Sequence, residues 1–81
     1  MVEDRASWLQ IAMQTSSFRQ MYRLADAIAT SAVATSIERR AARRVVGSLR
    51  DVIDAPIAEA AVLAKARKRF TWLVNSLRLA A

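Results

Sequence analysis

The chain lacks cysteine and histidine altogether, and its 81 residues include one glycine, one proline and few aromatic side chains. Without cysteine it has neither a disulfide nor a thiolate metal site. Without histidine it lacks the commonest general base and the usual zinc ligand. Long hydrophobic runs are also missing. The uncharged stretch of residues 27–37 contains four serines or threonines and is too short to span a membrane.

The seven acidic residues offer no catalytic arrangement. Glu38 is explained by helix capping, Asp54 by a turn at Pro56, and Asp26 by pairing with Arg23 three residues earlier. The sequence contains no glycine-rich phosphate loop and no metal-ligand spacing. We therefore predict a protein that is not an enzyme, with no catalytic residue, no metal site and no cofactor of its own.

Alanine and arginine dominate what is present. Alanine is the best helix former, and the scarcity of glycine and proline leaves long helices uninterrupted. Eighty-one residues make one domain at most, and a chain of this length is only marginally stable alone. The net charge of +6 attracts acidic partners: nucleic acid, anionic lipid or an acidic protein. Alanine-rich helix faces bind lipid interfaces weakly, so we rank a membrane surface last.

The first long helix is expected from about Phe18 to about Thr35, after an N-cap hydroxyl within residues 15–17. Its apolar residues recur at three- and four-residue spacing and share one face. They are Phe18, Met21, Tyr22, Ala25, Ile28, Ala29 and Ala32. Before it lies an arm of residues 1–16, in which Asp4 can cap a short helix. Trp8 in this arm either packs on its own bundle or anchors the arm on a neighbouring subunit.

A capping box, Thr35 with Glu38, begins a second helix of about Ser36–Ile53. Gly47 weakens this helix and is interpreted as the mark of a close crossing. The expected apolar stripe of the helix is Ile37, Ala41, Ala42, Val45, Val46, Leu49, Val52 and Ile53.

Pro56 marks the start of a third helix that runs toward Leu79. Its expected buried side is Ile57, Ala60, Ala61, Leu63, Ala64, Ala66, Phe70, Leu73, Val74 and Leu77. Short connections force neighbouring helices to be antiparallel. The predicted fold is therefore all-α: a three-helix antiparallel bundle over residues 17–81, with the short N-terminal helical arm of residues 1–16.

Arginines form the strongest charge feature. In a helix, Arg39 stacks on Arg43 and Arg40 on Arg44, which brings four guanidiniums together on two adjacent lines. Guanidiniums make bidentate contacts with phosphates or carboxylates. A second basic segment, residues 65–69, precedes Phe70 and Trp72. Either segment can equally be a solvated helix face.

At Met21-Tyr22-Arg23 the chain resembles the LYR-motif family of small, basic, three-helix mitochondrial proteins. The family signature is Leu-Tyr-Arg early in the first helix, and here Met21 replaces the leucine. An arginine-rich segment follows, residues 39–44, and Leu49-Arg50 stands where the family has Phe-Arg. Asp54-Ala55-Pro56-Ile57 is similar to the family's acidic and proline-containing entry into its third helix.

The resemblance implies a non-enzymatic accessory subunit or assembly adaptor of a mitochondrial complex of the respiratory-chain type, located on the matrix side. Family members bind acyl carrier protein, an acidic partner that carries an acyl chain on phosphopantetheine, and take the chain between their helices. The motif match assigns Tyr22 and Arg23 to partner binding. From their charge, we expect Arg39, Arg40, Arg43 and Arg44 to contact the acidic partner. Small residues would line the acyl channel, unless they serve close helix packing: Ala25, Ala29, Ala32, Ala41 and Ala42.

Two other functions stay open. A basic helical bundle of phage or plasmid type could bind nucleic acid, although no helix-turn-helix spacing, zinc finger or aromatic single-strand motif is present. A purely structural subunit would pack all these faces on its neighbours. Glu3 and Asp4 stand where a secretory signal or a mitochondrial presequence would be basic, which leaves an uncleaved or already processed protein and a cytoplasmic location as alternatives.

Overall fold

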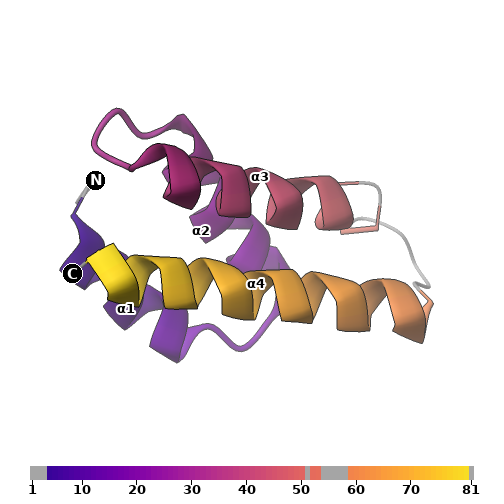
Figure 1. Ribbon diagram of the computed structural model, residues 1–81. Coiled ribbons are helices and arrows are strands. Elements are labelled where there is room, and N and C mark those ends of the chain that lie inside the picture. The colour runs from indigo at the N-terminus through magenta and orange to yellow at the C-terminus, as the bar shows by residue number, and fades with distance from the viewer. Residues whose placement is uncertain (1–3, 51, 54–58, 81) are drawn as a thin grey trace.

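Four helices make up the computed structural model of the chain, which describes residues 4–50, 52–53 and 59–80. They are α1 (Arg5–Gln14), α2 (Phe18–Thr30), α3 (Ser36–Leu49) and α4 (Ala60–Ala80). Figure 1 shows α3 and α4 side by side and antiparallel, with α2 behind them and α1 beside the C-terminal half of α4. The described residues contain no strand, so the all-α class is confirmed, but the bundle has four helices rather than three.

The fourth helix is the expected N-terminal arm. Asp4 caps α1, since its carboxylate accepts a hydrogen bond of 2.8 Å from the backbone N–H of Ser7. Trp8 is only 2% exposed and lies in the core together with Ala12. Helix α1 therefore packs on its own bundle, and Trp8 is not available as an anchor for a neighbouring subunit.

Capping boxes begin both middle helices. Ser17 caps α2 with Gln20, and Thr35 caps α3 with Glu38, as expected for α3. The first long helix ends at Thr30 rather than at Thr35. Ser31 turns to extended backbone, and Thr35 must itself be extended to act as an N-cap, so the helix cannot continue through this segment.

The second long helix ends at Leu49 rather than at Ile53. The carbonyl of Leu49 accepts hydrogen bonds from the N–H groups of both Val52 and Ile53, so the chain tightens into a turn there. Helix α4 begins at Ala60. The predicted start at Pro56, like the rest of residues 54–57, lies outside the described residues.

The core lies where α2, α3 and α4 meet, and α1 closes one end of it. Its largest fully buried apolar side chains are Trp8, Ile28, Val45, Leu49, Leu73 and Leu77. Tyr22 and Ala29 from the predicted face are half-buried at its edge. Five residues expected inside are exposed: Ala32, Ile37, Ala60, Ala61 and Ala64. Ala32 is exposed because it follows the end of α2, and Ile37 because Glu38 is the buried residue in that turn.

Gly47 does not mark a close crossing. It lies on the exposed side of α3, and a Cβ atom at this position would have nothing within 4 Å. The crossings of α3 with α2 and α4 use the alanine and valine side chains of its buried face instead, such as Ala42 and Val45.

A buried carboxylate ties α1 to α3. The two Glu38 carboxylate oxygens accept hydrogen bonds from the Arg5 guanidinium, at 2.7 Å from Nε and 2.9 Å from Nη2. One oxygen also accepts from the backbone N–H of Thr35 at 2.6 Å. Burial by itself would raise the pKa of Glu38, but the hydrogen bonds from Arg5 and Thr35 outweigh it and lower that pKa. The hydrogen bond with Glu38 in turn raises the pKa of Arg5.

Candidate functional site

Positive charge is concentrated on α3 and α4. Nine of the 13 basic residues lie there, four in α3 and five in α4. The only acidic residue within these two helices is Glu38, which is buried and paired with Arg5. Nine cations less one carboxylate give the pair of helices a net charge of +8, more than the +6 of the whole chain.

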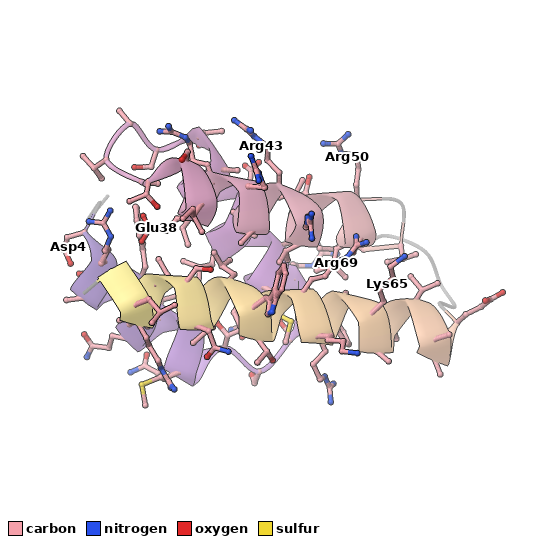
Figure 2. The ribbon with its side chains drawn as sticks, viewed as in Figure 1. Asp4, Glu38, Arg43, Arg50, Lys65 and Arg69 are labelled. Atoms are coloured by element: carbon pink, nitrogen blue, oxygen red, sulfur yellow. The ribbon has the colours of Figure 1, made fainter. Side chains whose placement is uncertain are left out.

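The four arginines of α3 lie on two sides of the helix. Arg39 is half-buried, and its Nη1 donates to the carbonyl oxygen of Ser31 at 3.2 Å. Figure 2 shows Arg43 and Arg50 pointing away from the bundle. Arg40 and Arg44 line a groove shared with α4. Adjacent residues of a helix differ by about 100° in direction, so the Arg40–Arg44 line faces α4 while the Arg39–Arg43 line does not.

The groove between α3 and α4 has a volume of about 390 Å³. Three large apolar side chains around it are exposed: Ile37 (69%), Trp72 (61%) and Leu79 (88%). The Arg44 guanidinium carbon lies 5.6 Å from the centroid of the Trp72 ring, a cation–π distance. The remaining lining residues are Arg40, Ala41, Asn75 and Ser76. The groove therefore combines an apolar surface with two guanidiniums and no carboxylate.

Further cations continue this face beyond the groove. Nη1 of Arg69 donates to Ser48 Oγ at 2.6 Å and to the carbonyl oxygen of Arg44 at 3.3 Å, so Arg69 links α4 to α3. Figure 2 shows Lys65 and Arg69 extending from α4 toward α3. We call this surface the basic groove face. It comprises the groove residues together with Ser48, Lys65 and Arg69.

The Met-Tyr-Arg motif lies elsewhere. Tyr22 is half-buried and packs against the core from α2. Arg23 is exposed and lines a second groove of about 380 Å³ between α1 and α2, which also includes Trp8, Ile11 and Leu24. Arg23 therefore shares no groove with Arg40 and Arg44, and the expected partner-binding residues form two separate surfaces.

The five alanines predicted to line an acyl channel have different surroundings. Ala25 and Ala42 are completely buried within the core, where they serve close helix packing. Ala41 is buried at the floor of the basic groove face. Ala29 is half-buried, and Ala32 is exposed in the α2–α3 connection.

Sequence reasoning missed Ile37 and Leu79 as members of the site. The signal for Leu79 was available, because Trp72 and Leu79 are seven residues apart and lie on one line of α4, away from its buried stripe. Ile37 had no such signal, since its spacing fits the apolar stripe of α3. The basic groove face can bind a partner that carries both anionic and apolar groups. Its side chains do not form a group suited to acid–base or nucleophilic chemistry.

Two other kinds of site are missing from the described part of the chain. No group of three or more acidic residues could hold a metal ion there. None of its helices is both long and apolar enough to cross a membrane.

No family model, curated protein or solved structure matches this chain, so the basic groove face and the charge distribution carry the functional argument.

Proposed function

We propose that this protein is a non-enzymatic adaptor that binds an acidic protein partner through the basic groove face. One observation carries the proposal: α3 and α4 together have a net charge of +8, and their single acidic residue is neutralised inside the fold. A surface of one sign speeds encounter with a partner of the opposite sign and disfavours basic partners.

The exposed apolar side chains favour a protein over nucleic acid as the partner. Ile37 and Leu79 offer surface to an apolar side chain, whereas a phosphate backbone has no group that gains from contact with them. Arg40 has no hydrogen bond or ion pair among the described residues, so its guanidinium is available for a bidentate contact with a carboxylate.

The resemblance to the LYR-motif family gives the proposal a narrower form. In that form the chain is an accessory subunit or assembly adaptor of a mitochondrial complex, and acyl carrier protein is its acidic partner. The charge of α3 and α4 supports this choice. Because Ala25 and Ala42 are closely packed, an acyl chain between α2 and α3 would require these helices to separate.

A second candidate function rests on the Arg44–Trp72 pair. An exposed aromatic ring next to arginines is the arrangement on which single-stranded nucleic acid stacks its bases. This function predicts binding whose affinity falls steeply as salt rises.

Native mass spectrometry of the protein isolated from its own source tests these functions together. A bound small acidic protein with the mass of an acyl-phosphopantetheine group would support the narrower form. A different acidic protein would support the adaptor function without the family resemblance. Bound nucleic acid would favour the second candidate, and isolation without any acidic partner would contradict the proposal.

Charge reversal on the groove side of α3 tests which surface binds. Arg40→Glu combined with Arg44→Glu should weaken partner binding by at least about tenfold, because it places two carboxylates against an acidic surface. Arg43→Glu combined with Arg50→Glu makes the same change in net charge on side chains that point away from the bundle, and it should weaken binding much less. Isothermal titration calorimetry with acyl-loaded acyl carrier protein measures both.

Retained binding by the groove variant at moderate salt would contradict the proposal. Arg23→Glu in the same titration tests the motif separately, since Arg23 lines the other groove. Unchanged affinity of that variant would make the Met-Tyr-Arg match coincidental.

A further inference from the structure

We infer that the groove between α3 and α4 receives an amphipathic, acidic helix. The apolar residues of the bound helix would rest on Ile37, Trp72 and Leu79, and its flanking carboxylates would meet Arg40 and Arg44. This inference rests on the proposed function and specifies the structural form of the partner.

The dimensions of the groove suit a helix. From Ile37 to Arg44 it follows α3 for two turns, and from Trp72 to Leu79 it follows the antiparallel α4 for the same distance, about 10 Å. A helix laid along it would present apolar side chains at positions i, i+3 or i+4, and i+7. A peptide bound by strand addition would need a free strand edge, and the described residues contain no strand.

Two contacts between α3 and α4 hold the walls of the groove in place. The Arg44 guanidinium over the Trp72 ring joins the two walls at one end of the groove. Farther along, Arg69 joins α4 to Ser48 of α3. Side chains that are already positioned lose less conformational freedom when a partner binds. The side chains at this end of the groove are therefore positioned before a partner binds.

Charge decides which helix fits. A second copy of this chain would bring another α3 and α4 with a net charge of +8 against the first, and like charges across an interface are strongly unfavourable. A neutral apolar helix would leave Arg40 and Arg44 without counter-charges at the rim. An acidic amphipathic helix satisfies both the apolar surface and the guanidiniums.

Three synthetic peptides of about 18 residues test the inference, a length at which an isolated helix can form. The first is an amphipathic helix with leucines on one face and glutamates beside them. The second is a scrambled isomer with the same composition and charge, and the third replaces each glutamate with glutamine. The chain contains two tryptophans, so its NMR spectrum has two indole N–H signals, and Trp72→Phe assigns them.

The amphipathic acidic peptide should shift the Trp72 signal, leave the buried Trp8 signal nearly unchanged, and bind at least about tenfold more tightly than either control peptide. Ile37→Ser combined with Leu79→Ser should remove most of this preference. Met13→Ser is the matched control, because Met13 is an exposed apolar side chain on α1, outside the groove.

Equal binding of the scrambled peptide would overturn the inference while leaving the proposed function intact, since charge alone would then suffice. Failure of all three peptides to bind at low salt would overturn both. A single-stranded oligothymidylate that shifts the Trp72 signal at lower concentration than the amphipathic peptide would also overturn the inference, and it would favour nucleic acid.

Discussion

Glu38 has two structural roles, and only one of them can be read from its neighbours in the sequence. As the third residue of a capping box it pairs with Thr35, three positions away. As the buried partner of Arg5 it joins segments 33 residues apart. A cap is a local arrangement that spacing reveals, whereas the ion pair exists only because α1 packs beside the start of α3.

Replacing Glu38 with glutamine should separate these roles. Gln20 completes the capping box of α2, so a glutamine side chain in the same place on α3 can retain the cap while the charge is removed. Arg5→Met should destabilise the fold more than Glu38→Gln does at neutral pH, because it leaves a buried carboxylate without its counter-ion. Urea unfolding followed by circular dichroism compares the two, and equal losses of unfolding free energy would contradict this expectation.

Acid should weaken the wild-type fold through the same residue. The pKa of Glu38 is lower in the folded chain than its ordinary value of 4.5. Its contribution to stability is therefore fully present above about pH 4.5 and is lost as the pH falls through the folded pKa, since the unfolded state then binds more protons. The melting temperature of the wild type should fall more steeply below this pH than that of Glu38→Gln. Parallel curves would contradict the assignment.

At the scale of the element, α3 shows what helical periodicity decides and what it leaves open. The period correctly placed Ala42, Val45 and Leu49 inside. It also placed Ile37 inside, but this residue is exposed and forms part of a groove wall. Periodicity shows which residues point in the same direction from the helix axis. Whether a residue on that face is buried also depends on where along the helix the neighbouring helices contact it.

Gly47 gives α3 a conformational weakness with no packing reason. Its substitution by alanine meets nothing within 4 Å, so Gly47→Ala should stabilise the fold by about 1 kcal/mol through helix propensity alone. Ala64→Gly makes the reverse change at an exposed position of α4 and should cost a similar amount. Urea unfolding measures both free-energy changes. A Gly47→Ala variant that is less stable than the wild type would contradict the expectation that this position has free space for a methyl group.

At the scale of the whole molecule, α1 packs against α2 and α4 and covers one end of the core. Trp8 fills one end of the core, and the Arg5–Glu38 pair fixes the same helix to α3. Such a short chain buries a limited share of its surface, so each large buried side chain contributes a large part of its stability. The N-terminal helix is therefore part of the folding unit.

Trp8→Ala should consequently destabilise the fold by about 3–5 kcal/mol, the usual cost of emptying a large aromatic site in a core. Met13→Ala, on the exposed side of the same helix, should change the unfolding free energy by no more than about 0.5 kcal/mol. Thermal unfolding followed by circular dichroism distinguishes the two. A Trp8→Ala variant as stable as Met13→Ala would mean that α1 is dispensable.

Composition and local spacing were enough to predict the helical class, the capping residues Asp4 and Thr35, an N-cap hydroxyl within residues 15–17, and the basic character of α3 and α4. These properties depend on composition or on residues within about four positions of one another, which is the range of helical hydrogen bonds and caps.

The surroundings of those residues depend on how the helices pack against one another. Packing buried Trp8, gave Glu38 its Arg5 partner, and turned Arg40 and Arg44 toward α4 while Arg43 points away. It also brought Ile37 and Leu79 to one groove. The physical reason is distance along the chain: these relationships join helices separated by tens of residues, and a one-dimensional pattern carries no record of which helix faces which.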